Sequence, residues 1–161
     1  MDTVSHAFWA FFATREKKWK WQSVCFSILP DVPRLFGIAY WVLLGLGYHA
    51  ALEMSVRSFE TIFSIAFHSL VVVAIFALLW FCFRRAWPIG ALVGWLLHIV
   101  LDILTHGGDA QPIFWPLSDF SISSPVSYYR LDYFAGFFVV ANVALIVLVI
   151  AWMVWKRKRK A

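Results

Sequence analysis

The sequence predicts an all-α membrane protein, a polytopic helical bundle with about four hydrophobic spans and a short N-terminal helical hairpin. Of its 161 residues, 62% are hydrophobic and only 14% are charged, and the mean hydropathy is +0.76. A soluble domain has about 25% charged residues, so this chain could hardly bury its apolar surface in water. Four uninterrupted apolar stretches each reach about the 17 to 25 residues that cross a bilayer as a helix. They are Leu35–Leu52, Thr61–Phe83, Ala86–Leu104 and Phe134–Trp155.

Residues 1–34 form the first part of a single membrane domain, 1–161. Two apolar stretches, Val4–Ala13 and Trp21–Leu29, are too short to cross a bilayer and flank the basic segment Arg15–Lys20. This pattern predicts two helices that are half-buried in the membrane or lie at its interface. Because no basic region leads into an apolar run at the start, we expect no cleavable signal peptide.

The rest of the domain divides by composition. Residues 35–104 hold the first three spans, 105–133 a loop, 134–155 the last span and 156–161 a basic tail. The loop contains Pro112, Pro116 and Pro125 among Ser, Asp and aromatic residues, so we expect it to be irregular and to lie over a site.

The formal charge of +5 is gathered into blocks at the ends of apolar stretches. These blocks are Arg15–Lys20, Arg84-Arg85 and Lys156–Lys160. Basic residues next to spans favour the cytoplasmic side, which predicts a cytoplasmic C-terminus. A nucleic-acid binder would spread its charge over one face, so we expect no nucleic acid as a primary partner.

Polar residues cluster where the third span ends. His98, Asp102, Thr105 and His106 fall on one side of a helix, and Gly107-Gly108 then ends it. An ionisable group inside a span costs at least about 2.5 kcal/mol, so such residues normally face a protein interior. Imidazole and carboxylate groups at this spacing can share a divalent ion. The alternative is a hydrogen-bonded contact between helices.

His68 is the expected partner of this cluster. It lies about as far before the Arg84-Arg85 turn as His98 and Asp102 lie after it, so antiparallel helices would bring the three to one height. Glu60, Thr61 and Ser64 share its helical side, and this polar stripe should face the third span. In that span Gly90 and Gly94 continue the face of His98 and permit close packing.

Three more residues can be read in two ways. Asp31, in the proline-flanked segment Leu29–Pro33, is either a rigidly held carboxylate or a helix N-cap. His6 is either a ligand or a side chain at the membrane interface. His49, four residues before Glu53, is interpreted as structural because polar neighbours are lacking.

Taken in order, these residues stand in recognisable motifs: Ser5-His6, Leu29-Pro30-Asp31, Phe67-His68-Ser69-Leu70, the stretch from His98 to Gly108, and Phe114-Trp115-Pro116-Leu117-Ser118-Asp119. The chain resembles the bacterial inner-membrane family of YdjM-like metal-dependent hydrolases. In ligand order that family is similar to zinc-dependent phospholipase C and the P1-type nucleases, which are all-helical polynuclear zinc enzymes.

The resemblance implies a ligand set and a location. The implied ligands are His6, Asp31, His68, His98 and Asp102, with Asp31 and Asp102 catalytic and Asp102 bridging two ions. His106 is implied as a further ligand or as a group beside the ligands. The metal would be one or two divalent ions, zinc first and manganese second. A third metal site of the kind in those enzymes is not expected, because no His follows His106 and no Glu follows Glu60, so that only Asp109, Asp119 and Asp132 could substitute. The implied location is the bacterial inner membrane.

These observations favour a metal-dependent hydrolase, a phosphoesterase that acts on a lipid or lipid-like substrate through metal-activated water. The alternative is a non-enzymatic membrane protein that binds or moves metal ions or protons, since intramembrane His and Asp also mark ion pathways. The first and last spans offer little polarity beyond His49 and Asn142, which favours a one-sided pocket. A structural membrane subunit is the third interpretation.

One topological conflict accompanies these expectations. If Arg84-Arg85 is cytoplasmic, the site and Asp31 lie toward the outer leaflet, and the spans Leu35–Leu52 and Thr61–Phe83 would both have to begin outside. Either Leu35–Leu52 does not fully cross the membrane, or the N-terminal residues are not in the site.

Overall fold

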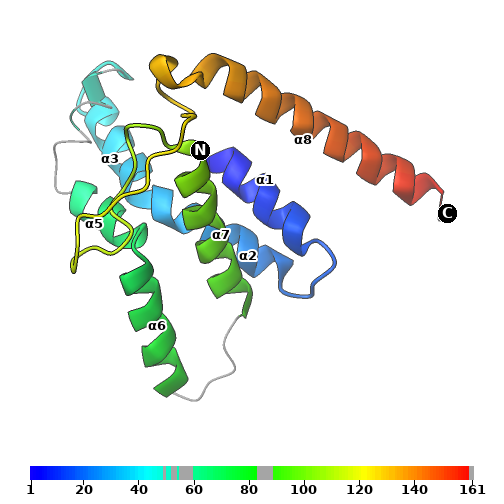
Figure 1. Ribbon diagram of the computed structural model, residues 1–161, viewed down its shortest axis with the longest axis horizontal. Helices are drawn as coiled ribbons and strands as arrows, with labels where there is room; N and C mark the ends of the chain where they lie inside the picture. Colours follow the sequence, from blue (N-terminus) through cyan, green and yellow to red (C-terminus); the bar gives the residue numbers. More distant parts are fainter. Residues whose placement is uncertain (49, 52–53, 55–59, 83–88, 160–161) are drawn as a thin grey trace.

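A computed structural model describes residues 1–48, 50–51, 54, 60–82 and 89–159, and it contains helices but no strand in these ranges. The all-α prediction is therefore confirmed for the described residues. Figure 1 shows the helices gathered around α7, with α8 extending along one side. The elements are α1 (Thr3–Thr14), α2 (Lys20–Ile28), η1 (Leu29–Asp31), α3 (Val32–Leu43), α5 (Glu60–Phe67), α6 (Leu70–Cys82), α7 (Ile89–Thr105), η2 (Leu131–Tyr133) and α8 (Ala135–Lys158).

Helices α1 and α2 form a hairpin at the N-terminal end of the chain. The side chain of Asp2 caps α1 by accepting a hydrogen bond of 2.9 Å from the backbone N–H of Ser5. The turn between the helices contains the basic residues of the segment 15–20, and α2 then packs back against α1. The two short apolar stretches thus pair with each other. Trp21–Leu29, predicted to be too short to cross a bilayer, is part of a longer apolar unit.

The predicted span Leu35–Leu52 is wrong in its bounds. Helices α2, η1 and α3 follow one another as a 24-residue unit, Lys20–Leu43, that is long and apolar enough to cross a membrane. Pro30 and Pro33 do not break this unit, because each lies in the first turn of a helical element, where no N–H partner is lost. The unit ends at Leu43, just before Gly45 with a φ of +92°. His49 and Glu53 lie outside the described residues.

The predicted span Thr61–Phe83 is bent. Its helices Thr61–Phe67 and Leu70–Cys82 meet at an angle of 66°, at His68 and Ser69. The loop after α7 supplies the bonds that hold this bend. The hydroxyl of Ser69 donates to the carbonyl of Trp115 at 2.5 Å, and the N–H of Leu70 donates to the carbonyl of Ile113 at 2.8 Å. Continuous hydropathy could not indicate a bend that depends on a distant loop.

By length and apolarity, the described helices include two that could cross a membrane, Lys20–Leu43 and Ala135–Lys158, or three if the bent pair counts as one span. Helix α7 is a shorter apolar helix of 17 residues. Many large apolar side chains of α6 and α8 are exposed, including Phe81 at 80% and Phe137 at 77%. Such surfaces suit contact with lipid and are uncommon in soluble monomers.

Helices α2 and α7 make the closest approach in the fold. A Cβ atom added to Gly90 would lie 2.6 Å from the carbonyl oxygen of Trp19, and one added to Gly94 would overlap the carbonyl of Ser23. One turn further on, Nδ1 of His98 lies 2.7 Å from the carbonyl oxygen of Ser27. Because both partners advance by one turn at each step, α2 and α7 run parallel.

This packing corrects two expectations. The Gly90 and Gly94 face contacts α2, not the segment 61–83, because the small residues Ser23 and Ser27 on α2 let the backbones approach. Helix α5, which carries Ser64, packs on α3 and η1, while α6 packs on α7. The polar stripe of α5 therefore does not face α7 as a whole.

The topological conflict does not arise in this arrangement. Because Lys20–Leu43 runs parallel to α7, the next step of the same register after Ser27 and His98 pairs Asp31 with Asp102 at one height. Asp31 belongs to the middle of a candidate span, so it does not need to lie outside it. The wrong bounds of the first predicted span created the conflict.

Helix α8 joins the bundle along α1. Trp9 donates its ring N–H to Oδ1 of Asn142 at 3.0 Å, and the Asn142 amide donates to the hydroxyl of Ser5 at 2.9 Å. At the other end of both helices the guanidinium of Arg15 lies 5.5 Å from the ring of Trp152. The basic α1–α2 turn and the basic end of α8 therefore lie on one side of the molecule (Figure 1).

The α2–α7 approach predicts the effect of adding a methyl group. We expect Gly94→Ala to destabilise the protein by roughly 1–3 kcal/mol, because the new Cβ overlaps the Ser23 carbonyl in a packed contact. Gly136→Ala is the matched control, since no atom lies within 4 Å of its added Cβ. The measurement is the thermal midpoint in detergent, and equal midpoints for the two variants would contradict the close approach.

Candidate metal centre

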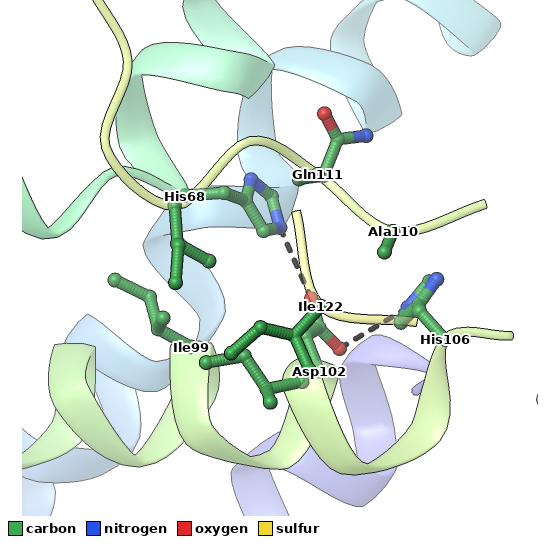
Figure 2. A pocket seen from close by; sticks show the side chains of 9 residues that line it. His68, Ile99, Asp102, His106, Ala110, Gln111 and Ile122 are labelled. Atoms are coloured by element: carbon green, nitrogen blue, oxygen red, sulfur yellow. Dashed lines mark ion pairs between the residues drawn. The ribbon is translucent and has the colours of Figure 1, made fainter. Parts of the chain in front are cut away.

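Four histidines surround the carboxylate of Asp102. Oδ1 of Asp102 lies 2.9 Å from Nε2 of His6 and 3.2 Å from Nε2 of His106. Oδ2 lies 3.2 Å from Nε2 of His68 and 3.1 Å from Nε2 of His98. Figure 2 shows His68 and His106 on opposite sides of Asp102. The two carboxylate oxygens thus face different pairs of imidazole rings.

Each of these side chains is placed by a separate part of the fold. His6 belongs to α1 and is fully buried, and His68 stands at the bend between α5 and α6. His98 and Asp102 lie one turn apart on α7, and His106 directly follows that helix. The predicted matching of heights between His68 and the α7 residues is present, because the Nε2 atoms of His68 and His98 are 3.0 Å apart.

Three of the four rings have a fixed proton on Nδ1. Nδ1 of His68 faces the carbonyl oxygen of Ser64 at 2.6 Å, and Nδ1 of His98 faces that of Ser27 at 2.7 Å. A carbonyl oxygen only accepts hydrogen bonds, so each Nδ1 must carry the proton. In a neutral ring Nε2 then carries a lone pair, and this lone pair points toward Asp102. This is the arrangement that partner groups impose on metal-binding histidines.

Three hydrogen-bond acceptors, on His68, His98 and Asp102, therefore face one another with no donor between them. The Nε2 lone pairs of His68 and His98 face each other at 3.0 Å, and both face Oδ2 of Asp102 within 3.2 Å. Buried acceptors in this arrangement repel unless a cation lies between them. Either a divalent ion or an additional proton on one ring would supply that cation. The donor set of two imidazoles and a carboxylate suits zinc.

His6 also has a ring nitrogen that lacks a hydrogen-bond partner among the described residues. Its ring stacks on that of His98 with centroids 3.8 Å apart, and its Nδ1 is buried without a hydrogen-bond partner among the described residues. A buried unpaired nitrogen is rare and needs a physical reason. The interpretation of His6 as an interfacial side chain does not fit its full burial in this cluster.

Asp31 does not act as a helix N-cap. It stands at the start of α3, but its side chain makes no capping hydrogen bond. Instead Oδ2 accepts a hydrogen bond of 2.7 Å from the hydroxyl of Thr3, and Oδ1 lies 3.9 Å from Nε2 of His98. The side chain is turned toward α1 and α7, so the reading as a held carboxylate is the one that fits.

Two groups of residues bring three ligand atoms within 4.8 Å of one another, and they share His98. These groups are His6, Asp31 and His98, and His68, His98 and Asp102. His98 has one free lone pair, because its Nδ1 proton is engaged by Ser27. It can therefore bind one ion only. The sequence analysis thus singled out residues that do lie together, and His106 adjoins them at Asp102.

Sequence reasoning missed two neighbours of the cluster. The amino group of Met1 donates to Oδ1 of Asp102 at 2.6 Å and to Nε2 of His106 at 2.8 Å. A positive donor thus already serves the Oδ1 side of Asp102. Asp109 accepts the Nδ1 proton of His106 at 3.1 Å and orients that ring. The spacing of three residues between His106 and Asp109 could have indicated this pair.

Two other loop carboxylates stay away from the cluster. Asp119 is exposed, and Asp132 is exposed and pairs with Arg130 at 2.9 Å. Neither adds to a third metal site among the described residues.

A cavity of about 480 Å³ opens beside the cluster. Residues from α1, α3 and the loop after α7 line it together with the His and Asp residues. The lining residues include Asp2, Val4, Asp31, Arg34, Leu35, Ile38, Asp109, Gln111 and Tyr129. The loop residues Ala110, Gln111 and Ile122 line a second, smaller pocket around Asp102 together with His68 and His106, as Figure 2 shows. The cluster is thus covered by the loop on one side and open to a cavity on another.

The loop and the start of the chain add polar groups to this cavity. Burial and the nearby Asp31 carboxylate raise the pKa of Tyr129, so its hydroxyl stays protonated at neutral pH. That hydroxyl donates to the carbonyl of Met1 at 3.2 Å. Burial alone would raise the pKa of Asp2, but hydrogen bonds from Ser5 and Tyr128 lower it overall, so Asp2 is ionised.

No family model, curated protein or solved structure matches this chain. The resemblance to the YdjM-like family therefore rests on the motifs in the sequence. The geometry of the cluster is an independent observation on the same residues.

The three acceptor atoms on the Oδ2 side of Asp102 predict metal binding that depends on this carboxylate. We expect Asp102→Asn to weaken zinc binding roughly tenfold or more, because it removes the charge that faces all four rings. Asp119→Asn, an exposed carboxylate of the loop, is the matched control. The measurement is the zinc content of purified protein after equilibration with zinc. Undiminished zinc in Asp102→Asn would contradict a metal centre at this position.

The contact between Asp109 and His106 predicts a second, smaller effect. We expect Asp109→Asn to lower zinc affinity by roughly 10–100-fold if His106 is a ligand, because the amide orients the ring less well than a carboxylate. Asp132→Asn removes a loop carboxylate that pairs with Arg130 instead and should leave the affinity unchanged. Competition with a zinc-sensitive dye measures both, and equal affinities would place His106 outside the ligand set.

Proposed function

We propose that the protein is a membrane-embedded metal-dependent hydrolase, a phosphoesterase that cleaves a lipid or lipid-like substrate. The observation that carries this proposal is the convergence of three acceptor atoms, Nε2 of His68, Nε2 of His98 and Oδ2 of Asp102. A cation belongs at such a point, and an adjacent cavity offers a place for a substrate. Fold class and apolar helices alone would support many other functions.

The residues that would hold divalent ions are those around Asp102. His68 and His98 would bind on the Oδ2 side, with His6 and His106 on the Oδ1 side, so Asp102 is the group able to bridge two ions. When bound, a divalent ion such as zinc supplies hydroxide near neutral pH and neutralises the charge that develops on a phosphoester.

Asp31 is the second catalytic carboxylate in this proposal. Its Oδ2 is engaged by Thr3, while its side chain is 18% exposed and lines the cavity. Oδ1 is therefore free to accept a proton from an attacking water molecule. The register of α2–α3 against α7 supports this role, because it keeps Asp31 at the height of His98.

A lipid or lipid-like substrate is supported by the walls of the cavity. Val4, Leu35 and Ile38 line it beside the ionisable groups, and Val4 and Leu35 are also exposed on the outer surface of the helices. An apolar rim that continues onto a lipid-facing surface admits the tail of an amphiphile, while its headgroup reaches the polar end.

The alternative, a carrier of metal ions or protons, is disfavoured by the packing of α2 against α7. An ion path through the protein would have to continue from the cluster toward the basic side. There the successive contacts of Gly94 with Ser23 and of Gly90 with Trp19 bring the two backbones together. A one-sided site suits an enzyme better than a conduit.

The proposed location is the bacterial inner membrane, with the basic ends of α1 and α8 in the cytoplasm. These ends lie together, as the contact between Arg15 and Trp152 indicates, and basic residues favour the inner side. The cluster and the loop over it then lie toward the opposite leaflet.

Hydrolysis of phospholipids tests this proposal. Protein reconstituted into nanodiscs with zinc should release headgroup or phosphate from labelled phospholipids. We expect Asp31→Asn to lose at least about a hundredfold in rate, because a catalytic acid–base group contributes about that much. Asp119→Asn should keep the wild-type rate. If Asp31→Asn hydrolyses as fast as Asp119→Asn, or if no ester of the panel is cleaved by the zinc-loaded protein, the proposal is wrong.

A further inference from the structure

Arg34 is a cation without a protein partner in a cavity rich in carboxylates. It belongs to α3, one turn after Asp31, and its side chain is half-buried and lines the 480 Å³ cavity. Within the described part of the chain its guanidinium forms no hydrogen bond and no ion pair. The charge of Arg34 acts on the hydroxyl of Tyr129, which lines the same cavity.

The position of Arg34 along the chain makes this unusual. It lies near the middle of Lys20–Leu43, a helix long and apolar enough to cross a membrane. A guanidinium there is costly unless it faces water or a binding partner. Asp2, Asp31, Asp102 and Asp109 line the same cavity, yet none of them pairs with it. Arg34 is thus held in the cavity but apart from its carboxylates.

We propose that Arg34 binds the anionic oxygen of a phosphoryl group, and so selects a phosphate ester for this site. The inference rests on the proposed function and adds the group that recognises the substrate. The same cavity holds acceptors that need a cation and a guanidinium that needs an anion. A phosphoester spans both, because its oxygens can meet a metal and an arginine together.

The arrangement of charges favours a phosphoryl group over a neutral ester or amide. A neutral carbonyl would leave the guanidinium desolvated without a counter-charge, which is unfavourable in a half-buried cavity. The planar fork of arginine matches two phosphoryl oxygens, and the apolar residues Leu35 and Ile38 follow on the same helix. The headgroup phosphate of a lipid and a free phosphate ester share this chemistry.

Binding of inorganic phosphate tests the role of Arg34 without relying on turnover. The full-length protein in detergent, equilibrated with zinc, is titrated with phosphate in a calorimeter. We expect Arg34→Gln to lower the affinity at least about tenfold, as the loss of a charge-assisted hydrogen bond does. Arg34→Lys should fall between, because it keeps the charge and loses the fork. Arg130→Gln is the matched control, an exposed arginine paired with Asp132 outside the cavity.

The zinc content of each variant separates this inference from the proposed function. We expect Arg34→Gln to bind as much zinc as the wild type. Equal phosphate affinity in Arg34→Gln and Arg130→Gln would overturn the inference, as would a wild-type protein that binds no phosphate. Loss of zinc from Arg34→Gln would also overturn it, since Arg34 would then support the metal centre itself. A protein that binds zinc and phosphate as expected but cleaves no lipid keeps the inference and loses the hydrolase.

Competition distinguishes the two sources of the phosphoryl group. If dioctanoyl phosphatidic acid displaces phosphate from the wild type, the anion in use is a lipid headgroup. If glycerol 3-phosphate competes and the short-chain lipid does not, the substrate is a soluble phosphate ester. Either result supports an Arg34-dependent site, provided that Arg34→Gln weakens the competitor as it weakens phosphate.

Discussion

The close approach of α2 to α7 is the contact on which the candidate site depends. Gly90 and Gly94 let the α2 backbone come near enough for the Ser27 carbonyl to accept the Nδ1 proton of His98. That bond decides which nitrogen of His98 faces Asp102, and the same register brings Asp31 beside the ring. A glycine pair that looks like ordinary packing thus fixes the tautomer of a histidine and the position of a carboxylate.

Among the described residues, buried polar side chains are concentrated where helices meet, while many large apolar side chains are exposed. His6, Ser23, Ser27 and His98 are fully buried, whereas many leucine and phenylalanine side chains are exposed. This distribution suits a lipid environment, where apolar exposure is favourable and polar side chains gain by meeting one another.

The sequence could predict what depends on local helical geometry. The spacing of His98, Asp102 and His106 on α7, and their common height with His68, follow from helical rise and from the turn between the helices. Partners that come from distant segments could not be read in this way. The first span was predicted to begin too late, because Pro30 and Pro33 lie in the first turns of helical elements and do not break the helix there. The contact of the glycine pair with α2 could not be predicted, because an apolar pattern does not indicate which helix it packs against. The pairing of Asp109 with His106 depends on how the loop folds back.

The bend at His68 links the loop to the candidate metal ligands. The loop carbonyls of Ile113 and Trp115 hold Leu70 and Ser69, the residues that directly follow His68, and Ser64 before the bend holds the ring itself. The loop that covers the cluster therefore also holds His68 in place. Displacing the loop would break the hydrogen bonds that hold the bend between α5 and α6 and would move the His68 side chain. The cavity beside α1 and α3 offers a molecule a way to Asp102 that leaves this bend in place.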